Sequence, residues 1–466
     1  MHKYNLYKLT AIILFFISCS KSEDNQLPPS AQLTVKISST NPLNSKIEWT
    51  NTDNSQNKTT YYDLYLGDEL IAEHIDGNTF EFEELKGLTE YQGKVIAKDI
   101  NNKTITSTEY KFFTDKKQFE GNVELKSQED IDNFTSKGYN IINGNLIING
   151  EASNITTLFS FTDLNQINGD LFVVNTTLEN LNGLENTTLA SPDARLVIIN
   201  NDELTNIEAV PNVTSVSSLR ILGNNLLQSL NGLHNLKTIQ QELSIGLNPA
   251  ITNLNTLQNL SFAHKINITG NEALENLHGL EQIKDINTIV IKNNTSLKTM
   301  EGLQNLTSCE LYFTIENNDQ LHSLKGLSKL TSTAAIKIIN NASLNNISDL
   351  SNLKSVSYLI EIKNNIKLIS LDGIQNVVYD NNLTGKKLFI QNNPEITTLE
   401  AISNYTFERG VINISNNSKL DNFCGLKKLL TEIKHKDFDE NSFIYNNAYN
   451  PSSEDILNEK CSSARF

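Results

Sequence analysis

The sequence predicts an all-β protein in which a β-sandwich precedes a long β-solenoid with short capping helices. Two observations carry this prediction. Between residues 31 and 115, seven short strand-like runs alternate with turn clusters rich in Asn, Asp and Gly. From about residue 123 to 430, apolar residues recur at a spacing of 23 or 24 residues, with one spacing of 28.

The N-terminal segment has the features of a bacterial lipoprotein signal. Two lysines precede a mostly apolar run, 9–17, that is too short to span a bilayer as a helix. Residues 16–19 read F-I-S-C and resemble a lipobox, which implies that a signal peptide, 1–18, is removed and that Cys19 is acylated. Several acyl chains would attach the protein to a membrane through this N-terminal lipid. The alternative is an ordinary secretory signal with a cysteine at its cleavage site.

A polar tether, 19–30, follows and contains two prolines. Its acidic start, with Glu23 and Asp24, resembles the export tag of surface lipoproteins in Bacteroidota-type bacteria. The resemblance implies a lipid-anchored protein of the outer membrane that faces the cell exterior. The chain has 38 Lys and Arg against 54 Asp and Glu, a net charge of −16, which disfavours nucleic acid and anionic lipid surfaces as partners.

The segment 31–115 contains the strand-like runs of the predicted sandwich, at 33–37, 46–50, 61–66, 70–75, 80–85, 91–98 and 110–114. Trp49, the only tryptophan, lies on the second run, and 85–91 reads L-K-G-L-T-E-Y. These residues resemble a fibronectin type III domain, an Ig-like sandwich. The resemblance implies that Trp49 is a core residue and that Tyr91 is the tyrosine-corner residue.

The repeat between residues 119 and 430 has a consistent consensus. Apolar anchor residues occur once in each turn, at Leu196, Leu219, Leu243, Ile266, Ile289, Phe313, Ile336, Ile360, Leu388 and Ile412. Five residues after every anchor stands an asparagine: Asn201, Asn224, Asn248, Asn271, Asn294, Asn318, Asn341, Asn365, Asn393 and Asn417. The eighth and fourteenth positions after the anchor are apolar, and the thirteenth is often glycine.

This consensus predicts the interior of the solenoid. An apolar-x-apolar strand points two side chains inward in each turn, and stacked turns pair their strands in parallel. The asparagine at the following bend is expected to face inward, where its amide can accept from and donate to the main chain of adjacent turns. We therefore predict that the asparagines form a buried structural ladder.

Two early turns, 142–148 and 167–173, read I-N-G-N-L-I-I and I-N-G-D-L-F-V. They resemble the receptor L-domain, a right-handed parallel β-helix, whereas later turns approach leucine-rich-repeat spacing, so both cross-sections remain open. Capping-box spacings at 127–130 and 452–455 predict a short helix at each end, the second within a C-terminal cap, 431–466. In an oxidising compartment Cys424 and Cys461, which flank this cap, are expected to form a disulfide, and the resemblance to capped bacterial L-domain proteins points the same way.

No motif for catalysis, a metal or a cofactor stands out in the sequence. The histidines are scattered, and there is no phosphate loop, nucleophile elbow or dinucleotide fingerprint. A D-x-D-x-N sequence at 437–441 lacks the glycine and glutamate of a calcium loop. We expect a protein that is not an enzyme and holds no cofactor or metal. A polysaccharide-active enzyme is the less favoured alternative, because clustered carboxylates or basic residues are missing from any one face.

The positions one and three residues after each anchor are expected to face outward on the parallel sheet. This possible ligand face contains Arg220, Asn267, Lys292, Glu316, Lys337, Glu361, Lys363, Phe389 and Gln391. A second candidate is the insertion at 380–387, expected as a protruding loop. The sequence favours a non-catalytic binding or adhesion scaffold for an unknown protein or glycan ligand. A structural component of an outer-membrane complex is the alternative.

Overall fold

The structure is a computed structural model of the 466-residue chain. It describes residues 32–40, 44–52, 61–152, 154–210, 213–379, 385–406, 410–432 and 442–463. The predicted signal peptide, Cys19 and the tether lie outside these ranges. The chain divides into two compact units, of which the first comprises residues 1–83 with 89–114 and the second 84–88 with 115–466.

The first unit is built from two antiparallel sheets, as the all-β prediction requires. One sheet has the order β1-β2-β5 and contains β1 (Leu33–Thr40), β2 (Ser45–Asn51) and β5 (Thr79–Phe82). The other has the order β4-β3-β6-β7 and contains β4 (Glu69–Ile75), β3 (Tyr61–Leu66), β6 (Glu90–Lys98) and β7 (Thr104–Phe113). Strand β7 begins earlier than the sequence pattern predicts.

Alternating residues of these strands form the core of the first unit. On β2, Ile47 and Trp49 are buried, whereas the residues between and beside them are more exposed. The Trp49 ring meets the Tyr62 ring edge-on, with 5.3 Å between the ring centroids. Leu64 and Val95 from the other sheet are also buried, so the apolar residues of both sheets contribute to one interior.

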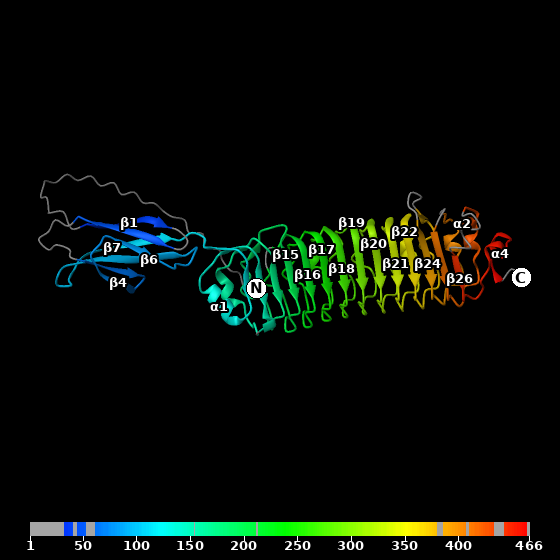
Figure 1. Ribbon diagram of the computed structural model, residues 1–466, viewed down its shortest axis with the longest axis horizontal. Coiled ribbons are helices and arrows are strands. Elements are labelled where there is room, and N and C mark those ends of the chain that lie inside the picture. Colours follow the sequence, from blue (N-terminus) through cyan, green and yellow to red (C-terminus); the bar gives the residue numbers. More distant parts are fainter. Residues whose placement is uncertain are drawn as a thin grey trace, which may run out of the picture. The chain divides into compact units, whose positions relative to one another are not determined.

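The second unit is a right-handed parallel β-solenoid of about 12 turns, which confirms the predicted fold class. Figure 1 shows its strands stacked side by side from β15 to β26. The main sheet follows chain order through β9 (Val123–Leu125), β11 (Leu146–Asn149), β13 (Leu171–Val174), β15 (Arg195–Ile199), β16 (Ser215–Leu222), β17 (Thr238–Gly246), β18 (Phe262–Thr269), β19 (Asp285–Lys292), β20 (Ser308–Glu316), β21 (Ser332–Ile339), β22 (Ser355–Lys363), β24 (Lys386–Gln391), β25 (Gly410–Ser415) and β26 (Ser442–Tyr445), with β23 (Val378–Tyr379) beside β22.

Smaller elements complete the first turns and the bends. A second parallel sheet contains β8 (Gln118–Glu120), β10 (Ile141–Asn143), β12 (Gln166–Ile167) and β14 (Thr188–Leu189). Within the described ranges the α-helices are α1 (Gln128–Thr135), α2 (Lys427–Glu432) and α4 (Ser453–Leu457). Short 3₁₀ turns occur at η1 (Gly150–Ala152), η2 (Phe159–Asp163), η3 (Asn255–Leu257), η4 (Ser348–Leu350), η5 (Glu400–Ile402) and η6 (Cys424–Leu426).

The anchor residues stack directly on one another. Leu219 pairs with Leu243, which pairs with Ile266, and this register continues through Ile289 and Phe313. Each anchor is almost completely buried in one continuous apolar cluster. The solenoid therefore repeats the same inward packing in every turn, and a modest apolar content is enough to fill its thin interior.

One local expectation is wrong at two residues. We expected residues 380–387 to protrude as a loop, but Lys386 and Lys387 belong to β24, where Lys387 pairs with Leu359 of β22. The lateral pairing with β22 extends the strand toward its N-terminus. The remainder of the expected loop, 380–384, lies outside the described residues.

Both ends of the solenoid carry short helices. The Ser127 side chain accepts a hydrogen bond from the backbone N–H of Asp130 at 3.0 Å, and helix α1 buries Ile131 in the core. At the other end, Ser452 and Asp455 form a reciprocal capping box at α4. Cys424 and Cys461 are joined by a disulfide, with 4.9 Å between their Cα atoms.

Candidate functional site

The asparagine that follows each anchor lies in the interior and is fully buried. In a representative turn, Asn294 Nδ2 donates to the Ile268 carbonyl of the preceding turn at 3.0 Å. Asn294 Oδ1 accepts from the backbone N–H of Asn271 at 3.0 Å and from Asn271 Nδ2 at 3.3 Å. The backbone N–H of Asn294 donates in turn to Asn318 Oδ1 at 3.1 Å. Because the ladder satisfies its own amides, it stabilises the fold and has little to offer a ligand.

The ends of this inner ladder are occupied by residues that the sequence pattern did not single out. At the first end, the Thr176 hydroxyl donates to Asn201 Oδ1 at 2.7 Å. At the other, the Asn417 backbone N–H donates to Asn447 Oδ1, and the Asn447 backbone N–H donates to Asn450 Oδ1, both at 3.0 Å. The regular spacing of asparagines stops after Asn417, which is why a search for the period misses the last two amides.

A second, outer ladder precedes the inner one by one residue. Asn293, Asn317 and Asn340 have φ values near 55°, in the left-handed region that asparagine tolerates better than most residues. Asn317 Nδ2 donates to Asn293 Oδ1 at 2.8 Å, and Asn340 Nδ2 donates to Asn317 Oδ1 at 2.8 Å. The sequence signal was present as repeated Asn-Asn pairs. At the equivalent position Leu247, with a φ of 53°, is 62% exposed.

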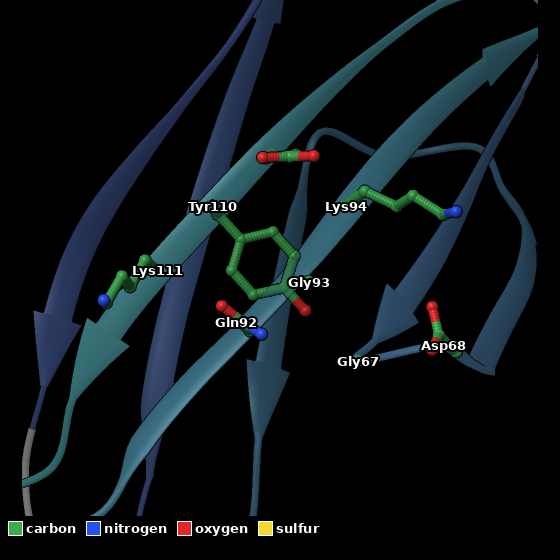
Figure 2. A pocket seen from close by; sticks show the side chains of 8 residues that line it. Gly67, Asp68, Gln92, Gly93, Lys94, Tyr110 and Lys111 are labelled. Carbon is green, nitrogen blue, oxygen red and sulfur yellow. The ribbon is translucent and has the colours of Figure 1, made fainter.

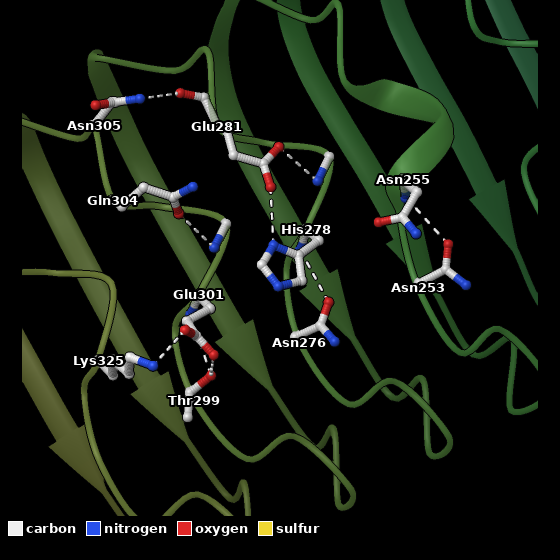
Figure 3. A network of polar contacts seen from close by, with 12 residues as sticks. Asn253, Asn255, Asn276, His278, Glu281, Thr299, Glu301, Gln304, Asn305 and Lys325 are labelled. Carbon is white, nitrogen blue, oxygen red and sulfur yellow. Dashed lines mark hydrogen bonds and ion pairs between the residues drawn. The ribbon is translucent and has the colours of Figure 1, made fainter.

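A third row of polar side chains shapes the bend opposite the main sheet (Figure 3). Ten residues after each anchor stands Asn, Ser or Thr, whose side-chain oxygen accepts from the backbone N–H two residues later. Asn253 accepts from Asn255 at 3.2 Å, and Asn276 accepts from His278 at 3.1 Å. These Asx-type and ST-type turns explain why short polar residues recur at this position.

The glycine of the consensus lies where adjacent turns come closest. Gly302 has a φ of 115°, and a Cβ atom there would lie 2.0 Å from the Leu277 carbonyl oxygen of the preceding turn. Its backbone N–H donates to Gln304 Oε1 at 2.8 Å, and the equivalent Gly279 N–H donates to Glu281 Oε2 at 2.8 Å (Figure 3). Only glycine meets both the steric and the conformational requirement.

The titratable side chains near this bend serve the same structural purpose. Glu281, which already accepts from a glycine N–H, also contacts His278 Nδ1 at 2.9 Å (Figure 3). Glu301 forms an ion pair with Lys325 at 2.7 Å, and the hydrogen bond from Lys325 holds the pKa of the Glu301 carboxyl below its usual value. The cluster has carboxylates and a histidine, but their atoms are committed to the turn and to one another.

The predicted ligand face is the outer surface of the main sheet, and its residues do share that surface. Many of its charges are paired with the next turn: Arg220 with Glu242 at 2.9 Å, Lys292 with Glu316 at 2.5 Å, and Lys337 with Glu361 at 3.4 Å. Asn267 Nδ2 donates to Ser244 Oγ at 3.4 Å. The ion pairs make the N-terminal and central parts of the face largely neutral.

Glu242 forms ion pairs with two basic residues of this face. It contacts Lys265 at 2.8 Å as well as Arg220, and its side chain is only 17% exposed. Burial by itself raises the pKa of this carboxyl, but the hydrogen bonds and charges of the two basic residues outweigh burial and hold the pKa below its ordinary value of 4.5. The two ion pairs of Glu242 link β17 to β16 on one side and to β18 on the other.

The C-terminal end of the same face has a different character. Phe389 pairs with Asn413, which pairs with Phe443, while Gln391 pairs with Ser415, which pairs with Tyr445. Phe443 is 50% and Tyr445 is 44% exposed. The sequence predicted Phe389 and Gln391 as ligand-face residues, but it did not identify Asn413, Phe443 or Tyr445, because β26 lies beyond the regular period.

The first unit contains a surface hollow of about 400 Å³ between β6 and β7 and the Gly67-Asp68 turn (Figure 2). Tyr110 lies across Gly93, and its hydroxyl donates to the Tyr65 carbonyl at 2.7 Å. Burial raises the pKa of this phenol. Lys94 places its ammonium 4.9 Å from the centre of the Tyr65 ring. The Tyr110 hydrogen bond links β7 to β3 across the intervening strand β6.

Three further observations concern chemistry and membranes. Within the described ranges, no group of three or more His, Cys, Asp and Glu side chains could hold a metal ion. No helix in that part of the chain is both long and apolar enough to cross a membrane. Cys309 is a free, buried cysteine, and burial raises the pKa of its thiol to about 11, which disfavours the reactive thiolate at neutral pH.

Comparisons of this chain with protein-family profiles, with curated proteins and with solved structures find no match.

Proposed function

We propose that this protein is a surface lipoprotein whose solenoid acts as a non-catalytic binding or adhesion scaffold for a protein or glycan. One observation carries the proposal. The outer face of the parallel sheet holds its side chains in register from turn to turn, and it ends in solvent-exposed aromatic rings on β26. Exposed aromatic side chains on a rigid, repetitive surface are typical of recognition sites.

The N-terminal sequence supports the cellular part of the proposal. The lipobox-like residues 16–19 favour acylation of Cys19, and the acidic start of the tether favours display on the outer face of an outer membrane. In this proposal the first unit is a fibronectin type III-like spacer, supported by its two antiparallel sheets and buried Trp49. The solenoid is of the receptor L-domain or leucine-rich-repeat kind, supported by the asparagine ladder and the glycine at the close bend.

A non-catalytic role is supported by how the polar side chains are used. The carboxylates of Glu242, Glu281 and Glu301 bind backbone groups or basic side chains of the fold. A structural role in an outer-membrane complex is the alternative function, and it predicts that the partners are neighbouring membrane proteins.

The cellular proposal is tested by fractionation and surface proteolysis of the native, full-length protein. We expect the wild type to remain with membranes and to be cleaved when protease is added to intact cells. We expect Cys19→Ala to leave the membrane fraction, whereas the adjacent control Ser20→Ala should behave as the wild type. Protection of the whole chain on intact cells, together with crosslinks only to envelope proteins, would favour the structural alternative.

A further inference from the structure

The outer face of the main sheet changes its chemistry near its C-terminal end. Ion pairs link neighbouring turns from the Asp170–Arg195 pair to the Lys337–Glu361 pair. On β24, β25 and β26, by contrast, the outward residues paired in register contain no carboxylate. They are Lys387, Phe389, Gln391, Val411, Asn413, Phe443 and Tyr445, together with Ser415, which has the same orientation in the register but is fully buried beneath its neighbours.

Aromatic rings and polar side chains alternate across these three strands. Phe389 and Phe443 lie two strands apart with Asn413 between them, a separation of about 10 Å from the usual strand spacing. Gln391 Nε2 donates to Ser415 Oγ at 3.2 Å, and Ser415 Oγ donates to Asn413 Oδ1 at 2.8 Å. These contacts orient the amides and leave the Nδ2 group of Asn413 and the Oε1 atom of Gln391 with hydrogen-bonding capacity.

Two lysines flank the aromatic residues and lack a carboxylate partner in the described part of the chain. Lys387 places its ammonium 5.1 Å from the centre of the Tyr358 ring. Lys363 pairs in the sheet with Gln391, which pairs in turn with Ser415 of β25. Glu361 of β22 pairs in the sheet with Phe389, but its carboxylate forms an ion pair with Lys337 at 3.4 Å. In a chain with a net charge of −16, Lys363 and Lys387 therefore leave a local excess of positive charge at this end of the sheet.

We propose that this surface binds an acidic polysaccharide, a chain of sugar rings that carries uronate carboxylates. The proposal rests on the binding function proposed above and assigns it a ligand class. The apolar faces of the sugar rings would stack on Phe389 and Phe443, whose spacing suits alternate rings of an extended chain. Asn413 and Gln391 would bond the sugar hydroxyls, and Lys363 and Lys387 would complement the carboxylates.

An acidic polysaccharide accounts for more features of this surface than a protein partner does. Protein interfaces concentrate their energy in a packed, water-excluding centre. Here the rings are separated by polar side chains along the sheet, and neither lysine has a carboxylate partner among the residues that the structure describes. The separated aromatic rings suit the apolar faces of sugar rings, the amides suit the sugar hydroxyls, and the lysines suit the carboxylates. An acidic polysaccharide presents these three kinds of group in alternation along its chain.

The test is calorimetric titration of the full-length protein with hyaluronan oligosaccharides and with the same oligosaccharides after their carboxyl groups are reduced. We expect binding of the acidic form and binding of the reduced form that is weaker by about tenfold or more. Phe389→Ala combined with Phe443→Ala should weaken binding of both forms by at least about tenfold. Lys363→Gln combined with Lys387→Gln should remove the preference for the acidic form. Phe262→Ala, at a 46% exposed aromatic residue on β18, is the matched control and should leave binding unchanged.

Several results would overturn the assignment. Equal affinity for acidic and reduced oligosaccharides would exclude the charge-based selection, and unchanged binding in the double phenylalanine variant would place the ligand elsewhere. Absence of binding to hyaluronan and to the further uronate polymers alginate and polygalacturonate would exclude the ligand class. If surface display is then still observed and a purified protein partner is lost on Phe389→Ala with Phe443→Ala, the scaffold function stands and only the acidic-polysaccharide assignment fails.

Discussion

Removing one amide of the inner ladder tests whether the asparagines hold the solenoid together. In Asn294→Ala, the backbone N–H of Asn271, one Asn271 Nδ2 hydrogen and the Ile268 carbonyl each lose a partner. A buried polar group left unpaired costs about 1–3 kcal/mol. Since water can enter a polar cavity and replace part of the lost bonding, we expect the free energy of unfolding to fall by about 3–6 kcal/mol.

The neighbouring residue provides a matched control. Asn293 is also an asparagine in a ladder, but it is exposed and has a φ of 55°, which glycine adopts readily. Asn293→Gly should therefore change the stability by no more than about 0.5 kcal/mol. Far-UV circular dichroism during urea unfolding reports the solenoid. Fluorescence of Trp49, the only tryptophan, reports the first unit and should be unaffected in both variants.

Hydrogen exchange locates the effect. Each turn of a solenoid contacts mainly its neighbours, so Asn294→Ala should accelerate exchange in β18, β19 and β20 more than in β13. Equal destabilisation by Asn294→Ala and Asn293→Gly would refute the reasoning, because burial would then not distinguish the two ladders. A loss of stability below about 1 kcal/mol in Asn294→Ala would do the same.

Three further predictions concern other parts of the solenoid. Cys461→Ser should lower the free energy of unfolding by about 3–4 kcal/mol, because the bond to Cys424 closes a separation of 37 residues; reductant should destabilise the wild type but not the variant in thermal melts. Gly302→Ala should lower the free energy of unfolding, measured in urea, by at least about 2 kcal/mol. The control Gly385→Ala also has a positive φ, but nothing lies within 4 Å of the new Cβ, so it should lower the free energy of unfolding by only about 1 kcal/mol. Equal losses in the two variants would rule out the close approach of adjacent turns as the cause. The folded-state pKa of Glu242 is lowered, so its stabilisation is present above pH 4.5 and is lost as the pH falls through the lower folded value; Glu242→Gln should reduce the dependence of unfolding free energy on pH in that acidic range, and an unchanged profile would contradict this assignment.

The fold class could be predicted from the sequence because every turn of a solenoid repeats the same local pattern of residues. The anchor positions set the inward face, and the spacing of 23 or 24 residues sets the length of one turn. The inner asparagines could be identified for the same reason. The outer asparagines and the row of Asn, Ser or Thr at the bend opposite the main sheet were equally visible in the sequence. They were missed because exposed polar residues are common, and their lateral bonding is evident only when turns are superposed.

Other features depend on exceptions to the period. Asn447 and Asn450 extend the inner ladder, and Phe443 and Tyr445 extend the outer face, although all four lie beyond the regular period of the sequence. The strand β24 begins at Lys386, in a segment where the longer spacing predicted a loop. Strand pairing between adjacent turns determines which residues lie side by side at these positions. A constant spacing in the sequence cannot predict that alignment once an insertion has changed the length of a turn.

The sequence by itself determined that the chain is all-β, that its larger part is a repetitive solenoid, and which residues of each turn face the interior. These properties follow from local alternation and spacing. Only the tertiary structure decided which outward charges neutralise each other, since Arg220 and Glu242 lie on adjacent strands 22 residues apart. It also decided that Phe389 and Phe443 share one surface, because the register between β24, β25 and β26 brings together residues that are distant along the chain.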